Sequence, residues 1–341
     1  MKMDIEHGLS SRFRNMGIIC AFLVVVIHCT SNFHVSNPFV KMFIYDGVCR
    51  IAVPFFFFAS GFFLSAHFGE NRWWRKEVAK RIRTLLVPYF VFVTLYFAFV
   101  QFLDGWSLHG SLLKNLIFAY GLHPFCHPYL LPLWYIRALC VLVVLSPLLA
   151  VVLTRSRVSA VLALCVIFIG YLALGPWEGL DGRCAYFFRK TFAMQGLFYF
   201  SCGIFYRNWG GFAVGRKTAA TLVAVGLAGM TLKVVLQSGG SGLYYYFGTL
   251  SCLVLLSGVF NLLPTRPFPS WLTSCAFPIY VTHMFFVFAF RVVGDRCGLI
   301  IGENLMLWCL MPPLVFASCV GVILLQRRFL PRLNAILWGG R

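Results

Sequence analysis

Long apolar runs separated by short polar segments follow one another along the whole chain. An α-helix needs about 20 apolar residues to cross the roughly 30 Å hydrocarbon core of a bilayer, and many of the runs have this length. They are continuously apolar, whereas the strands of a transmembrane barrel alternate apolar and polar residues. The pattern therefore predicts an all-α, polytopic integral membrane protein of about ten transmembrane helices, near 16–35, 49–66, 84–103, 130–153, 157–175, 191–206, 217–236, 243–263, 272–293 and 304–326.

The composition excludes a soluble domain of this length. Hydrophobic residues make up 60% of the 341 residues, charged residues only 11%, and the mean hydropathy is +0.83. Ordinary globular domains carry about 25% charged residues. No internal repeat, low-complexity linker or soluble appendage stands out, so we expect a single membrane domain over residues 1–341.

The positive charge is explained by membrane topology. With the amino terminus inside, 19 of the 29 Lys and Arg residues fall in cytoplasmic segments. Cytoplasmic loops carry an excess of basic residues, so an even number of spans with both termini in the cytoplasm satisfies the rule. The formal net charge of +19 therefore gives no reason to expect a nucleic-acid partner. We expect a multi-pass protein of the cell inner (plasma) membrane.

The 13 cysteines are not arranged as a disulfide framework or a metal site. Most of them lie within or beside apolar spans, where a thiol behaves as a small hydrophobic group. Cys126, Cys184 and Cys297 fall in expected outside segments, so two of them could form one disulfide bridge if that side is oxidising. No Cys or His spacing fits a zinc site, and we expect no metal.

One ionisable residue lies deep in the first apolar run. His28 follows ten apolar residues from Ile18 to Ile27. An ionisable side chain inside a span is costly, and by default it indicates a functional site. An imidazole titrates near neutrality and can serve as a general base. A purely structural alternative is a histidine hydrogen-bonded to Ser31, Asn32 or a neighbouring carbonyl.

Several local patterns occur in an order that resembles the membrane acyltransferase-3 family. They are the first span with His28, the second-span segment Val53–Leu64, the basic segment Lys80–Tyr89, the fourth-span segment Leu133–Arg137, and the late segment Pro278–His283. The resemblance extends from about residue 12 to residue 326.

The resemblance implies a ten-helix transferase of the membrane. Its co-substrate would be acyl-coenzyme A, with acetyl-coenzyme A as the expected form, used on the cytoplasmic side without a bound cofactor. Its acceptor would be a hydroxyl group of a surface carbohydrate or of a lipid-linked sugar precursor. His28 is then expected to be the catalytic base. Membrane lipid is expected to surround the protein.

The chain departs from the family pattern near the start of the first span. The family commonly carries Arg eleven residues before the first-span histidine, and this chain has Gly17 there. Arg14 lies one helical turn earlier, on the same face as His28 but about 21 Å away along the helix. Arg14 is therefore a candidate substrate-binding residue, although it cannot touch His28 through its own helix.

A second departure lies in the basic segment after the second span. Six cations occur within twelve residues of an expected cytoplasmic loop, 67–83, and guanidinium groups bind phosphate through two hydrogen bonds. Arg81 matches the family pattern, but its partner position is Thr84, so Arg83 or Lys80 would have to supply a second charge. We expect Arg81 and Arg83 to bind the donor phosphates. The alternative is a loop that is basic only because it is cytoplasmic.

The remaining candidate substrate-binding residues are Arg50, Trp134, Arg137, Tyr280 and His283. Arg50 and Arg137 lie at or just inside apolar spans, where an unpaired guanidinium is expensive. They would bind the acceptor or orient the base, unless they extend to the interface along their aliphatic stems. Trp134 belongs to the fourth-span pattern, and Tyr280 and His283 belong to the late pattern.

Two alternatives to an active enzyme remain. A transporter or flippase would use the buried histidine and arginines to relay protons or bind a sugar or lipid, but no inverted repeat or paired broken spans are visible. A non-catalytic family member would explain the missing arginines at Gly17 and Thr84. Hydrolysis of acyl-coenzyme A or self-acylation would separate an enzyme from a transporter.

Overall fold

A computed structural model describes residues 2–104, 117, 120, 130–174, 194–210, 214–239 and 244–338. All regular secondary structure in these ranges is helical, as the continuous apolar runs predicted. Most of the described residues in each of the ten predicted spans are helical. The expected outside segments 104–129 and 176–190, with Cys126 and Cys184, lie almost wholly outside the described residues.

Seven helical segments of the described chain are long and apolar enough to cross a membrane: Gly8–Asn32, Val40–Ser65, Trp73–Leu103, Leu131–Arg155, Arg216–Ser238, Ala276–Arg296 and Leu305–Phe329. Two of the other predicted spans coincide with the shorter apolar helices Arg157–Ala173 and Phe247–Leu262, and the third, 191–206, overlaps the helix Met194–Trp209. Large apolar side chains are exposed along several of these helices, for example Val151, Val158, Leu162 and Val166. An exposed apolar surface of this kind suits contact with lipid. The chain is a multi-pass membrane protein.

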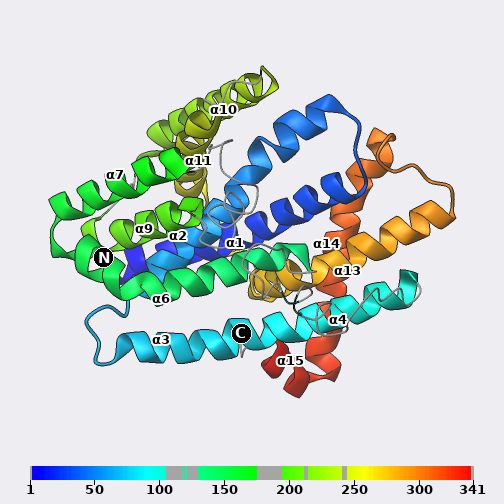
Figure 1. The fold of residues 1–341 in the computed structure, drawn as a ribbon, viewed down its shortest axis with the longest axis horizontal. Coiled ribbons are helices and arrows are strands. Elements are labelled where there is room, and N and C mark those ends of the chain that lie inside the picture. Colours follow the sequence, from blue (N-terminus) through cyan, green and yellow to red (C-terminus); the bar gives the residue numbers. More distant parts are fainter. Residues whose placement is uncertain are drawn as a thin grey trace. The chain divides into compact units, whose positions relative to one another are not determined.

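The described chain divides into two compact units. Unit 1 comprises residues 1–56 and 212–325, and unit 2 comprises 57–211 and 326–341. Unit 1 contains α1 (Lys2–Asn32), η1 (Val40–Tyr45), η2 (Val48–Ile51), α10 (Arg216–Ser238), α11 (Tyr244–Leu262), α12 (Ser270–Thr273), α13 (Ala276–Arg296), the start of α2 and most of α14 (Leu305–Phe329). Its α1 and α13 pack against each other, and α10 packs against α11 (Figure 1).

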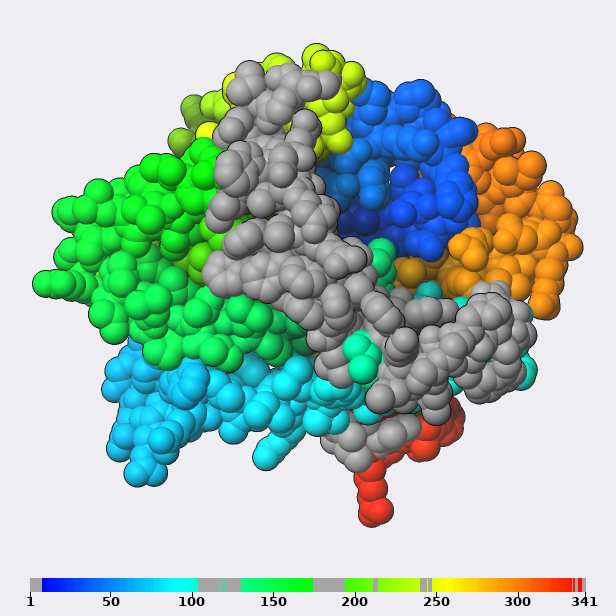
Figure 2. Space-filling view, viewed as in Figure 1, coloured from blue at the N-terminus to red at the C-terminus, as the bar shows by residue number. Residues whose placement is uncertain are grey.

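Contacts near the middle of α1 and just after its last residue fasten the helix to unit 1. Near the middle, the fully buried Asn15 donates to the carbonyls of Pro264 and Arg266 at 3.2 and 2.9 Å and accepts from the Phe268 N–H at 2.7 Å. Just after the helix, a Cβ on Gly302 would lie 2.0 Å from the Phe33 carbonyl oxygen, so only glycine fits. Figure 2 shows the blue N-terminal region beside the orange region of α13. These contacts tie α1 to the segment before α12 and to the segment after α13.

Unit 2 contains most of α2 (Ala52–Ser65), α3 (Trp73–Arg81), η3 (Ile82–Leu86), α4 (Val87–Asp104), η4 (Leu131–Leu133), α6 (Trp134–Arg155), α7 (Arg157–Leu174), α9 (Met194–Trp209) and α15 (Pro331–Leu337). The expectation of a loop over 67–83 was wrong for most of that range, because α3 continues through η3 into α4. Pro88 explains the wide π-helical turn of η3, since it has no N–H and its ring crowds the preceding turn. The Val87 N–H bonds instead to the carbonyl of Ile82, five residues back.

Two glycines allow α2 and α9 to approach closely within unit 2. A Cβ on Gly61 would lie 2.0 Å from the Phe200 carbonyl oxygen, and a Cβ on Gly203 would lie 2.0 Å from the Phe58 carbonyl oxygen. At each glycine, the backbone of the other helix therefore occupies the space that a side chain would need. Small residues at such positions let membrane helices pack without side chains between them.

Replacing Gly203 by alanine is expected to destabilise the protein. Alanine favours an isolated helix by about 1 kcal/mol over glycine, but overpacking a tight contact costs about 1–3 kcal/mol. With the Phe58 carbonyl oxygen 2.0 Å from the new Cβ, we expect the clash to dominate. Gly321→Ala is the matched control, because a Cβ there meets no atom within 4 Å. Thermal unfolding in detergent checks the pair, and equal melting temperatures would contradict the close packing.

Candidate active site

Two histidines from α1 and α13 come together inside unit 1. The ring centroids of His28 and His283 are 5.1 Å apart, and the ring planes make an angle of 44°. His283 is completely buried, and His28 is half-buried. The structure thus brings together two of the residues that the sequence nominated separately.

The hydrogen bonding of α13 fixes the ring of His283. Its Nδ1 donates to the carbonyl of Ile279, one turn back, at 3.0 Å. A carbonyl oxygen only accepts, so Nδ1 carries the proton of the neutral ring and Nε2 carries the lone pair. Within the described residues, Nε2 has no hydrogen-bond partner. The buried ring therefore presents a basic nitrogen.

A hydrogen bond links Asn32 to the main chain of His28. The Asn32 side-chain amide donates to the backbone carbonyl of His28 at 2.8 Å, one turn along α1. An imidazole on an apolar helix, beside a second imidazole, has the composition that general-base chemistry requires.

Arg50 lies in a polar cluster of unit 1 that also contains a lysine. Its Nη2 donates to the Asp46 carboxylate at 2.7 Å, and its guanidinium lies 4.4 Å from the centre of the Tyr45 ring. The Lys233 ammonium donates to the Asp46 backbone carbonyl at 2.8 Å. Asp46 therefore joins two cations, one through its carboxylate and one through its main chain.

Lys233 was not predicted from the sequence, although a signal was present. It stands within the predicted span 217–236, where a charged residue is as unusual as His28 is in the first span. Its stem runs over Gly248 of α11, where a Cβ would lie 3.1 Å from the lysine Cγ. The charge at the end of that stem also complements the carbonyl end of η1.

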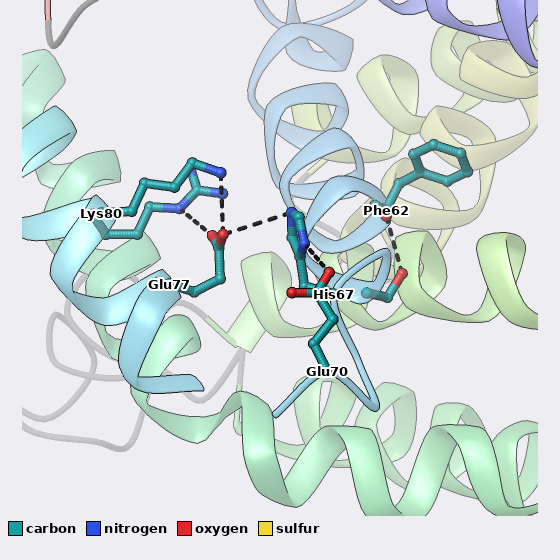
Figure 3. A network of polar contacts seen from close by, with 7 residues as sticks. Phe62, His67, Glu70, Glu77 and Lys80 are labelled. Carbon is teal, nitrogen blue, oxygen red and sulfur yellow. Dashed lines mark hydrogen bonds and ion pairs between the residues drawn. The ribbon is translucent and has the colours of Figure 1, made fainter. Parts of the chain in front are cut away.

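A buried carboxylate organises part of the basic segment in unit 2 (Figure 3). The side chain of Glu77 is 5% exposed, and Lys80 Nζ lies 3.1 Å from it. His67 Nε2 lies 3.7 Å from the same carboxylate, and His67 Nδ1 donates to Glu70 at 2.9 Å. That hydrogen bond lowers the pKa of Glu70. Arg81 completes the cluster, with Nε 3.5 Å from Glu77 in an ion pair without hydrogen-bond geometry.

The predicted cations of this segment differ in exposure. The Arg81 side chain is 16% exposed and faces Glu77, whereas Arg83 is exposed. Glu77 carries one negative charge and Lys80 and Arg81 carry two positive charges, but Glu70 of the same cluster adds a second negative charge. The exposed Arg83 nearby therefore supplies the positive charge that would attract an anionic ligand such as a phosphate.

The other predicted residues are distributed over both units. In unit 1, Tyr280 is buried one turn before His283, and Arg14 is exposed on α1. In unit 2, Trp134 and Arg137 are half-buried and lie three residues apart on α6, so they share a face. No group of His, Cys, Asp or Glu in the described ranges could hold a metal ion.

The comparison with protein families decides the kind of protein. The family model described as an acyltransferase domain, acyltransferase-3, matches residues 15–327. The chain belongs to the acyltransferase-3 family. This acyltransferase is also similar to the succinoglycan biosynthesis protein ExoH of Rhizobium meliloti (strain 1021), with 24% identity over 99% of this chain and 94% of the relative. No solved structure matches the chain.

The family assignment confirms the resemblance that the local patterns indicated. It places the chain among enzymes that transfer an acyl group from a donor to an acceptor, within a membrane. All eleven cysteines of the described chain have free thiols, including the exposed Cys297.

Proposed function

We propose that this acyltransferase moves a short acyl group from acyl-coenzyme A to a hydroxyl of a carbohydrate, with His28 as the general base. The observation that carries this proposal is the His28 and His283 pair, whose ring centroids lie 5.1 Å apart between two apolar helices. We further propose ten spans, both termini in the cytoplasm, and residence in the inner (plasma) membrane. The acceptor is a surface carbohydrate or its lipid-linked precursor.

The acyl group passes directly from the thioester sulfur of the donor to the hydroxyl oxygen of the acceptor. His28 takes the proton from the acceptor hydroxyl while the oxygen forms a bond to the thioester carbonyl carbon. The tetrahedral intermediate then collapses, the carbon–sulfur bond breaks, and the thiolate takes the proton back from His28. The products are an ester and free coenzyme A, and the histidine returns to its neutral form.

The other candidate residues are assigned to substrate binding. Arg81 and Arg83 would bind the donor phosphates, because guanidinium groups match phosphate geometry. Arg50, Trp134, Arg137, Tyr280 and Arg14 would bind or orient the acceptor and the donor. A carbohydrate acceptor is supported by the similarity to ExoH, a succinoglycan biosynthesis protein.

Transfer of a labelled acyl group tests the proposal against transport. Inside-out membrane vesicles containing the protein receive acetyl-coenzyme A labelled in the acetyl group, and carbohydrate and lipid-linked sugar fractions are then counted. We expect label in one of these fractions together with release of free thiol. Vesicles that lack the protein are the control. Equal label with and without the protein, for several short acyl-coenzyme A donors, would contradict an enzyme and favour a transporter or a non-catalytic protein.

A further inference from the structure

Two cations of unit 1, Arg50 and Lys233, are joined through one acidic residue, Asp46. We propose that Arg50 and Lys233 form a subsite for an oxyanion, a phosphate or a carboxylate group, that the acceptor carbohydrate carries. The inference rests on the proposed function, because it names the chemical class of the acceptor. The binding of an oxyanion can nevertheless be measured without any transfer reaction.

The charges around this subsite do not balance. Four elements of unit 1 pack against one another here: η1, η2, α10 and α11. The charged side chains that they carry near this end are Lys41, Asp46, Arg50 and Lys233, because α11 contains none. One carboxylate therefore stands against three positive charges. Excess charge at the end of an apolar span is costly, and a bound oxyanion would reduce that cost.

Both cations retain hydrogen-bond donors after their contacts with the described chain. A guanidinium has five N–H groups, and that of Arg50 donates to Asp46 at 2.7 Å and lies 4.4 Å from the centre of the Tyr45 ring. An ammonium has three N–H groups, and that of Lys233 donates to the Asp46 main-chain carbonyl at 2.8 Å. The remaining donors suit an oxyanion, since a guanidinium can bind two of its oxygens at once.

The subsite is held in place and is open to a ligand. The side chain of Arg50 is 44% exposed and that of Asp46 is 26% exposed. Lys233 is half-buried, and its stem lies over Gly248, where a Cβ would be 3.1 Å from the lysine Cγ. Because the stem is packed and the ammonium is already bonded, little side-chain freedom is lost when a ligand binds.

The position of the subsite along the spans favours the acceptor over the donor. Lys233 lies five residues before the end of α10, and Arg50 comes just before α2, which leads on to the basic helix α3. In the proposed topology both cations therefore lie at the outer ends of their spans, whereas acyl-coenzyme A is used on the cytoplasmic side. His28 lies toward the same end, four residues before the end of α1, and α1 packs against η1 and η2.

Thermal unfolding with soluble probes tests the subsite. Purified full-length protein in an uncharged detergent is titrated with glucose-1-phosphate, glucuronate or glucose at constant ionic strength. We expect the sugar phosphate or the sugar carboxylate to raise the melting temperature, and glucose to leave it unchanged. Lys233→Met removes the charge and keeps the length of the side chain, so it should weaken probe binding by about 10-fold or more. Failure of both charged probes to bind the wild-type protein would overturn the subsite.

Lys41→Met is the matched control, because Lys41 is an exposed cation of η1. It should leave the affinity for the probe within about two-fold, as expected of a screened surface charge. An equal loss in the Lys41 and Lys233 variants would show unspecific attraction and overturn the subsite. If the Lys233→Met protein does not accumulate, Lys233→Gln replaces it, since the glutamine amide can still donate to Asp46, and the same loss is expected.

Two further probes identify the source of the oxyanion. Inorganic phosphate and acetate carry the charged group without the sugar, and both should bind more weakly than the corresponding sugar derivative. Nanodiscs of phosphatidylglycerol and of phosphatidylcholine show whether a lipid headgroup takes the subsite. Loss of probe binding in phosphatidylglycerol alone, or equal affinity for the free ions, would overturn the assignment to the acceptor.

The outcomes separate this inference from the proposed function. A wild-type protein that binds a charged probe but transfers no labelled acyl group would overturn the proposed function and leave the oxyanion subsite in place. A protein that transfers the label but binds neither charged probe would overturn the subsite alone. Full probe affinity in the Lys233→Met protein would remove Lys233 from the subsite.

Discussion

Replacing His28 by alanine is expected to lower acyl transfer by about 10²-fold or more, because the reaction loses its general base. The protein should still accumulate in the membrane, since alanine costs less than an imidazole in an apolar span. His28 is also half-buried, so its removal leaves only part of its volume empty. Transfer of labelled acetyl groups, divided by the amount of protein in the membrane, measures the effect.

His34 provides a matched control for that substitution. It lies six residues after His28, is exposed, and has a φ of 52°, a left-handed conformation that asparagine tolerates well. His34→Asn also removes an imidazole from this region, and it should leave the rate of transfer unchanged. Comparable rates in His28→Ala and His34→Asn membranes would remove His28 from the mechanism.

The helices were predictable because hydropathy alone marks a membrane span. Each of the ten apolar ranges is mostly helical in the described chain, and seven helical segments there meet the length and hydropathy expected of a span. The helix α3 does not follow from hydropathy, because its nine residues include four cations and such polarity is typical of a loop. Several of these residues, such as Lys76, Ala79 and Arg81, are good helix formers. Helix propensity would have corrected the prediction of a loop that hydropathy gave for this segment.

The candidate site was predictable only in part. His28 stood out through one rule, that an ionisable residue in a span is costly, and the same rule applied to Lys233 would have found the second cation near Asp46. The pairing of His28 with His283 could not be derived, because 255 residues separate them and only tertiary packing brings their helices together. Asn15, which ties α1 to the segment before α12, gave no signal in the sequence.

The basic segment shows a different limit of a sequence pattern. Six nearby cations suggested a phosphate site, and the single buried carboxylate among them was overlooked. Glu77 is three residues before Lys80 and four before Arg81, and such spacings place side chains on one helical face. Once α3 is known to be a helix, the ion pairs follow from the numbering. The question is then whether Arg81 binds the donor phosphates or only neutralises Glu77.

Arg81→Ala is expected to raise the KM for acyl-coenzyme A by about 10- to 100-fold, while KM for the acceptor changes little. The estimate follows from about 1.5–3 kcal/mol for hydrogen bonds to a charged group. Arg81→Lys should restore only part of the affinity, because lysine is a point charge without the planar pair of donors. Initial rates over a range of donor and acceptor concentrations give both constants.

Two further variants distinguish a donor site from a structural ion pair. Lys80→Ala removes a cation that is 54% exposed and also faces Glu77, so it reports the effect of weakening the pair alone. In the double variant Arg81→Ala, Glu77→Gln, no buried carboxylate is left uncompensated. If Arg81 only neutralises Glu77, the double variant regains the wild-type KM and thermal stability. If Arg81 binds the donor phosphates, stability returns but KM for acyl-coenzyme A stays high, because neutralising Glu77 does not replace the guanidinium.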